Sequence, residues 1–193
     1  MSELDNIVPG LSYIQREGRL LPVGGYSDIV VREDLAWYVA SIAGIAAYDA
    51  TTKRVVGYEP ASGRYAADAP ERQIENIFIQ LDALFSLLAE RLGRQFVEKN
   101  VDETAKPYDV SLANLTRVSL YLAGDGPHDF ERADEAYRGE FTRRHVGMYP
   151  TRITTLGHRF PAEGALVEME FEAAVPKTPP EIQQTLASRS ITK

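Results

Sequence analysis

Arg152 is the side chain best placed to bind a small acid, and Glu168 is the carboxylate that we expect beside it. Pro150 fixes the start of a predicted strand, and Arg152 follows shortly after it. A planar guanidinium binds a carboxylate through two parallel hydrogen bonds. Glu168 belongs to a stretch in which acidic and apolar residues alternate, which places it on the polar face of the next predicted strand. The pair therefore indicates recognition of a carboxylate.

A salt bridge between Arg152 and Glu168 across a predicted hairpin is the competing interpretation. Surface ion pairs of this kind are common and contribute little. Glu168, Glu170 and Glu172 likewise have a simpler interpretation, as the solvated face of a strand. On spacing alone the salt bridge is the favoured interpretation, so the functional one needs independent support.

Other kinds of catalytic site find little support in the sequence. The chain has no cysteine, which excludes disulfides, cysteine nucleophiles and zinc-cysteine sites. His128, His145 and His158 lie far apart and share no metal-ligand spacing. Glycine-rich nucleotide motifs, zinc-protease motifs and the serine nucleophile elbow are missing. A metal enzyme or a histidine-based catalytic triad is therefore disfavoured.

The charge balance argues against nucleic acid as a partner. There are 21 Lys and Arg against 28 Asp and Glu, a net charge of -7, and the pair Arg143-Arg144 is diluted by acidic neighbours. No stretch approaches the roughly 20 apolar residues that cross a bilayer. The acidic start of the chain does not resemble a secretion signal. These features predict a cytoplasmic protein with neither a membrane nor a nucleic-acid partner.

Periodic patterns predict the elements that would position Arg152 and Glu168. Apolar residues recur at intervals of three and four after Asp68, which predicts a long helix that ends at Gly93. A second helix is predicted over residues 129–144, with Phe130, Ala133, Tyr137 and Phe141 on its inner face. Strands are predicted over residues 28–31, 36–43, 116–122, 152–158 and 165–175, the first two as an antiparallel hairpin.

This order of elements predicts an α+β fold, a sheet with two helices packed on one face. We expect an N-terminal arm over residues 1–23, a domain over residues 24–176 and a C-terminal tail over residues 177–193. Residues 94–111 are predicted to be a long loop or insertion within the domain. The sheet face without helices needs a cover, and copies of the same chain would supply one in a closed homo-oligomer.

Three motifs resemble one known family. They are Gly25-Tyr26-Ser27, Tyr149-Pro150-Thr151-Arg152 and the stretch from Gly164 to Glu170 that reads G-A-L-V-E-M-E. Over residues 24–175 the chain resembles the RidA/YjgF family of enamine/imine deaminases, which older names call translation inhibitors and L-PSP endoribonucleases.

The resemblance implies a homotrimer of chorismate-mutase-like subunits with an active site between neighbours. By this resemblance Arg152 binds the substrate carboxylate, Glu168 holds or activates water, and Tyr26 lines the pocket. Thr154 stands where the family often has Cys and is assigned to substrate binding. The implied reaction converts a 2-aminoacrylate-like enamine, through its imine, into a 2-oxo acid and ammonia without a cofactor.

Two further departures from the family pattern leave other functions open. Gly25 replaces the usual Pro, and Ala40-Ser41-Ile42 stands in place of the usual S-G-Q. A larger acid such as an amino-muconate is one alternative substrate. A trimer that binds small carboxylates as a sensor, without catalysis, is another, because it needs the same Arg152. The acidic composition argues against a ribonuclease.

Overall fold

A computed structural model describes residues 11–14, 28–49, 51–100, 108–124 and 130–177. The predicted site residue Tyr26, most of the predicted arm and nearly all of the predicted tail lie outside these residues. Within the predicted arm, β1 (Leu11–Ile14) pairs with β2 (Ile29–Glu33) as an edge strand of the sheet.

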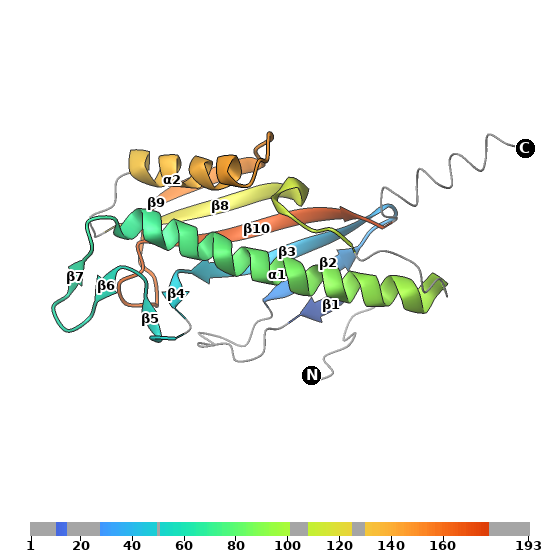
Figure 1. The fold of residues 1–193 in the computed structure, drawn as a ribbon, viewed down its shortest axis with the longest axis horizontal. Coiled ribbons are helices and arrows are strands. Elements are labelled where there is room, and N and C mark those ends of the chain that lie inside the picture. The colour runs from blue at the N-terminus through green and yellow to red at the C-terminus, as the bar shows by residue number, and fades with distance from the viewer. Residues whose placement is uncertain (1–10, 15–27, 50, 101–107, 125–129, 178–193) are drawn as a thin grey trace, which may run out of the picture.

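A six-stranded mixed sheet forms the body of the domain (Figure 1). Its order is β1-β2-β3-β10-β8-β9, and every neighbouring pair is antiparallel except β8 and β9. The predicted hairpin of the first strands is confirmed as β2 and β3. The other four strands of the sheet are β3 (Trp37–Ala46), β8 (Leu115–Ala123), β9 (Thr151–His158) and β10 (Val167–Pro176).

Two small hairpins lie between β3 and the first helix. They pair β4 (Tyr48–Asp49) with β5 (Arg54–Val55), and β6 (Tyr58–Glu59) with β7 (Arg64–Tyr65).

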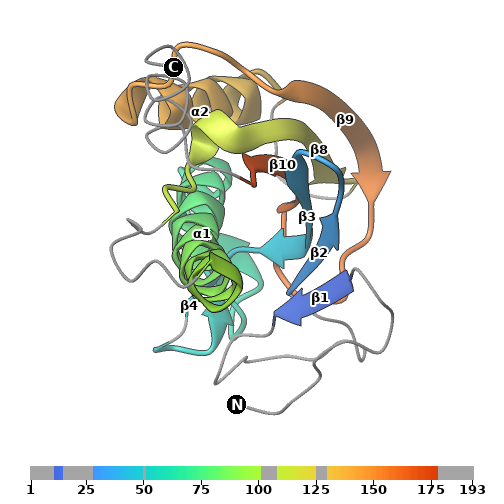
Figure 2. The ribbon, with the colours of Figure 1, turned by 90° about the vertical axis from the view of Figure 1, so that its right-hand side faces the viewer.

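Helices α1 (Ala69–Asn100) and α2 (Phe130–Arg143) cover the same face of the sheet, as predicted (Figure 2). Phe78 of α1 is fully buried where the layers meet. Its ring contacts Phe171 of β10 and Tyr137 and Phe141 of α2, with centroid separations of 6.1, 5.9 and 5.8 Å. The apolar stripe of each helix therefore closes one core with the sheet.

The predicted end of the first helix at Gly93 is wrong, because α1 continues through Asn100. A glycine within a helix costs only about 1 kcal/mol relative to alanine. The residues after it are mostly good helix formers, and the next proline comes only at Pro107. The predicted loop over 94–111 is thus helical in its first part, and it leads into a short 3-10 helix, η1 (Leu112–Asn114), capped by Ser111.

The predicted hairpin between the last two strands is also wrong. Strand β8 lies between β9 and β10 and pairs with both. Helix α2 connects β8 to β9, and such a helical crossover returns the chain parallel to the strand it left. Strand β10 lies between β3 and β8, so β8 separates it from β9. Arg152 and Glu168 are therefore not on adjacent strands.

Gln73 fixes the start of β10 against α1. Its side chain is fully buried and makes three hydrogen bonds. The amide nitrogen donates to the carbonyls of Val56 and Gly164, at 3.1 and 3.0 Å, and its oxygen accepts from the Leu166 N–H at 2.8 Å. A buried amide with all these partners holds its neighbours firmly. Leu166, which Gln73 holds, lies two residues before Glu168, so this hydrogen bond fixes the position from which the Glu168 side chain projects.

Candidate functional site

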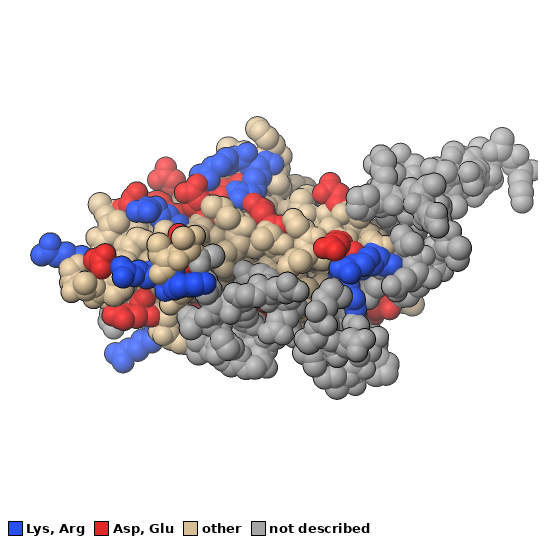
Figure 3. Space-filling view, turned by 60° about the horizontal axis from the view of Figure 1, so that its bottom comes forward, with Lys and Arg blue, Asp and Glu red and all other residues tan. Residues whose placement is uncertain are grey.

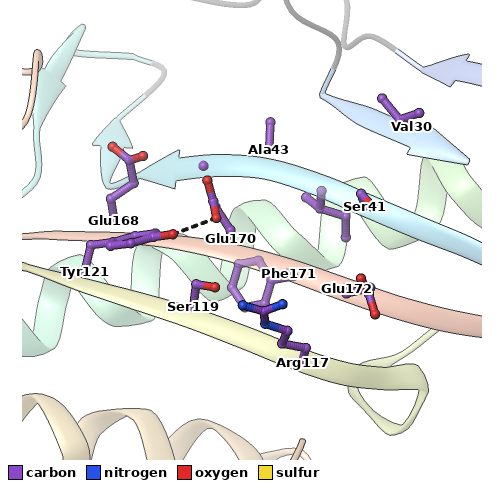
Figure 4. Close-up of a pocket in the computed structure, with 12 residues that line it drawn as sticks. Val30, Ser41, Ala43, Arg117, Ser119, Tyr121, Glu168, Glu170, Phe171 and Glu172 are labelled. Carbon is purple, nitrogen blue, oxygen red and sulfur yellow. Dashed lines mark hydrogen bonds between the residues drawn. The ribbon is translucent and has the colours of Figure 1, made fainter. Parts of the chain in front are cut away.

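A hollow of about 680 Å³ lies on the sheet face that carries neither helix (Figure 4). We call it the sheet hollow. Strands β2, β3, β8 and β10 supply its walls, and most of the side chains that project into it are polar. The side chains that project into the hollow are those of Val30, Ser41, Ala43, Arg117, Ser119, Tyr121, Glu168, Glu170 and Glu172, and Gly44 contributes backbone.

Glu168 lies at one end of the hollow, where β10 pairs with the last residue of β3 (Figure 4). Its carboxylate lies directly over Gly44, where a Cβ atom would come within 2.3 Å of Oε1. Burial raises the pKa of Glu168, the charge of Glu170 raises it further, and His158 acts in the opposite direction. A carboxyl group with a raised pKa accepts and returns a proton more readily near neutral pH.

Tyr121 and Glu170 form a fixed pair beside Glu168. The Tyr121 hydroxyl donates a 2.8 Å hydrogen bond to Glu170 Oε2 (Figure 4). That bond raises the pKa of Tyr121, which keeps the phenol protonated as a donor. The Tyr121 ring also meets His158 edge-on, with ring centroids 4.7 Å apart. Tyr121 therefore holds the Glu170 side chain in place, whereas Glu168 accepts no hydrogen bond from the described residues.

Gly44→Ala tests whether the position of the Glu168 carboxylate matters. The added methyl group would push aside the flexible end of Glu168 rather than backbone, so the fold should be kept. We expect any proton transfer through Glu168 to slow by about tenfold, because displacement of a reacting group by about an ångström is costly.

Gly139→Ala is the matched control for that substitution. Position 139 lies within α2 and a Cβ there meets nothing within 4 Å. This change should leave the rate unchanged and stabilise the protein by about 0.5–1 kcal/mol. Equal rates for parent and Gly44→Ala would show that the contact with Gly44 does not position the Glu168 carboxylate for proton transfer.

Arg152 faces the opposite side of the sheet. It pairs with Val118, which in turn pairs with Phe171, and all three project toward the helices. The guanidinium carbon lies 4.7 Å from the centre of the Tyr137 ring, and Nη2 lies 2.5 Å from Asp134 Oδ1 on α2. The predicted pairing with Glu168 is therefore wrong, since Arg152 forms its ion pair with Asp134.

The other predicted residues divide between these two places. Thr154 pairs with Leu120 and so lies on the same face as Arg152. Ser41, from the segment that replaces S-G-Q, reaches the rim of the sheet hollow (Figure 4). Tyr26 cannot be placed, because it lies outside the described residues. The structure thus groups Arg152 with Thr154 and leaves Glu168 apart from them.

Several residues of these two places had not been predicted. Gly44 belongs to no recognised motif, and its role is visible only from the close approach of the Glu168 carboxylate. Tyr121 carried a weak signal, because it is a polar aromatic residue on the outward side of the predicted strand over 116–122. Asp134 also carried a weak signal, because it is an acidic residue between Ala133 and Tyr137, which lie on the inner face of the helix.

In the described part of the chain, no three His, Asp or Glu side chains are grouped so that they could hold a metal ion. No described helix combines the length and apolarity needed to cross a bilayer.

Solved structures resemble this chain although its sequence matches no family model and no curated protein. One is a Rid-family protein of unknown function, YyfA from Yersinia pestis, with a TM-score of 0.56, 14% identity and coverage of 86% of this chain and 99% of the other. A putative endoribonuclease from Thermotoga maritima gives 0.52 and 18%, covering 84% and 95%. RidA from an Antarctic Psychrobacter gives 0.50 and 20%, covering 85% and 99%. The chain shares the fold of Rid/YjgF structures, as the resemblance in the sequence implied.

Proposed function

We propose that this chain is a cofactor-independent deaminase of the RidA/YjgF family, acting on enamines or imines that carry a carboxylate. The setting of Glu168 is the observation that carries the proposal. A half-buried carboxyl with a raised pKa, held over a glycine in a polar hollow, suits proton transfer. In the proposed assembly the subunit is chorismate-mutase-like and the protein is a homotrimer.

The reaction needs little from the protein beyond positioning and one proton shuttle. An enamine first gains a proton on carbon and loses one from nitrogen to become the imine. Water then adds to the C=N carbon as Glu168 accepts one of its protons and passes it to the nitrogen, which gives a carbinolamine. The carbinolamine hydroxyl then gives up its proton to the nitrogen through Glu168, so that the C–N bond breaks, the C=O bond forms and ammonia leaves. The product is a 2-oxo acid, and one water is consumed for each ammonia released. Arg152 would hold the carboxylate through its guanidinium.

The opposite placement of Arg152 and Glu168 favours a site shared between subunits. The two side chains project from opposite faces of one sheet, so one small acid cannot contact both within a single chain. Strand β9, which carries Arg152, is an edge strand, and its Ile153 and Leu156 are 48% and 59% exposed. Exposed apolar side chains on an edge strand are typical of an interface. In a trimer, this edge of one subunit would meet the sheet hollow of the next.

A ribonuclease is disfavoured by the local charges as well as by composition. Among the described residues, the sheet hollow carries three glutamates against one arginine, Arg117, and would repel a phosphodiester. Figure 3 shows basic and acidic side chains interspersed, with no continuous basic surface on the visible described residues.

A coupled assay tests the activity directly. A dehydratase acting on serine would generate 2-aminoacrylate, and the decay of the imine would be followed with and without the protein. The proposal expects decay to accelerate in proportion to protein concentration. If several 2-imino acids decay at the background rate while the protein still binds 2-oxo acids, the carboxylate sensor becomes the better explanation.

The shared site also predicts the oligomeric state. The protein should sediment as a trimer at micromolar concentration, because the carboxylate anchor and the proton shuttle must come from different copies. Ile153→Glu and Leu156→Glu together should shift it toward monomer and abolish turnover, since both side chains are exposed on β9. A monomeric parent with full activity would contradict the shared site.

A further inference from the structure

We infer that Asp134 competes with the substrate carboxylate for Arg152, and that the Tyr137 hydroxyl is a second donor to the bound carboxylate. This inference rests on the proposed function, which assigns Arg152 to carboxylate binding. It adds a residue that limits affinity and a residue that contributes to it.

The ion pair between Arg152 and Asp134 already has the chemistry of carboxylate recognition. Asp134 Oδ1 lies 2.5 Å from Arg152 Nη2, and both side chains are about one-fifth exposed, at 20% and 21%. Asp134 is a carboxylate on a helix, in the place where a ligand carboxylate would bind the guanidinium. A like charge this close opposes any anion that approaches Arg152.

Asp134 also has a second partner that would keep it bound after displacement. Arg138, one turn further along α2, contacts the other oxygen, Oδ2, at 2.9 Å. The Arg138 side chain is 60% exposed and so is free to move with it. Release of Arg152 therefore does not leave the Asp134 carboxylate without a counter-charge.

Tyr137 supplies the independent observation. Its side chain is buried, at 2% exposure, and its hydroxyl has no hydrogen-bond partner among the described residues. Buried hydroxyls are nearly always paired, so one without a partner calls for an explanation. The Arg152 guanidinium stacks on the Tyr137 ring and pairs with Asp134, so this unpartnered hydroxyl belongs to a side chain in contact with the Arg152 ion pair. Burial raises the pKa of Tyr137 to about 12, so the hydroxyl keeps its proton.

These contacts together describe a binding place for one carboxylate. Arg152 offers guanidinium N–H groups and Tyr137 offers an O–H, while Asp134 occupies one guanidinium nitrogen. A ligand carboxylate that displaces Asp134 would accept from both residues. Affinity would then be set by the difference between two carboxylates competing for the same cation.

Asp134→Asn tests the competition, with pyruvate as the probe and chemical-shift titration as the measurement. Asparagine keeps the shape and an acceptor oxygen but removes the charge. Pyruvate should bind about tenfold more tightly at low salt. The gain should shrink in 0.5 M NaCl, where the Debye length is only about 4 Å. Glu135→Gln is the matched control, because it removes the same charge from the neighbouring exposed position on α2.

Tyr137→Phe tests the second donor. It removes only an unpaired oxygen, so the protein should melt no lower than the parent, while pyruvate should bind severalfold more weakly. Unchanged affinity would remove Tyr137 from the site.

The arms of the experiment separate this inference from the function on which it rests. Arg152→Ala binding pyruvate like the parent would overturn the proposed site itself. Arg152-dependent binding that Asp134→Asn leaves unchanged or weakens would overturn only the competition, as would an equal gain from Glu135→Gln. Failure of both the parent and Asp134→Asn to bind pyruvate would overturn it as well.

Discussion

Glu168→Gln should lower the rate of imine hydrolysis by about 10²–10⁴-fold, the usual contribution of a general acid–base group. Glutamine keeps the shape of the side chain over Gly44 but cannot accept the proton of water. The affinity for a 2-oxo acid should change little, because Arg152 lies on the other face of the sheet. Initial rates of imine loss, measured beside pyruvate affinity, check both halves of the expectation.

Glu172→Gln is the control that the chain offers for this experiment. Glu172 lies on the same strand and face and lines the same hollow, but its carboxylate accepts from Thr116 at 3.3 Å. The rate of imine hydrolysis should fall less than twofold in Glu172→Gln. Equal losses of rate at both positions would instead show that the net charge of the hollow matters. An unchanged rate in Glu168→Gln would exclude that residue from proton transfer.

The raised pKa of Glu168 also links this substitution to the pH dependence of stability. Because the folded pKa lies above the unfolded one, the folded protein holds the proton more tightly between the two values. Stability therefore falls as pH rises through that window, and the full cost remains above the folded pKa. Glu168→Gln removes the cost, so it should melt higher than the parent at pH 7. The difference should disappear at a pH below the ordinary value for glutamate, as thermal unfolding at several pH values would show.

The elements of the fold were predictable because each carries its own period. The three-and-four spacing of apolar residues located α1 and α2, and the alternation in β8 and β10 located the central strands. Their order in the sheet was not predictable in the same way. Alternation tells which side of a strand is buried, but it does not say that β10 lies between β3 and β8.

The two halves of the site differ in predictability for a related reason. In β10 one face is wholly apolar and the other acidic, so the outward direction of Glu168 was clear from the sequence. In β9 both faces mix polar and apolar residues, because it is an edge strand that lies partly outside the core. No pattern in the sequence therefore indicates that Arg152 turns toward α2. Its ion pair with Asp134 depends on the tertiary packing of α2 and carried no motif.

Arg152→Ala should weaken the binding of pyruvate about ten- to a hundredfold. A hydrogen bond to a charged group contributes about 1.5–3 kcal/mol, and each 1.4 kcal/mol is a factor of ten in affinity. Arg152→Lys should recover only part of the loss, because a lysine lacks the planar fork and stacks less well on the Tyr137 ring. Titrations of the three proteins under the same salt conditions provide the comparison.

Arg117→Ala is the decisive control, because Arg117 is the arginine that shares the sheet hollow with Glu168. If the anchor is Arg152 of another subunit, removing Arg117 should change pyruvate affinity less than threefold. If Arg117→Ala loses binding while Arg152→Ala keeps it, the carboxylate is held on the same face and in the same chain as Glu168. In that case the site needs no neighbour, and Arg152 serves only the packing of β9 against α2 through Asp134 and Tyr137.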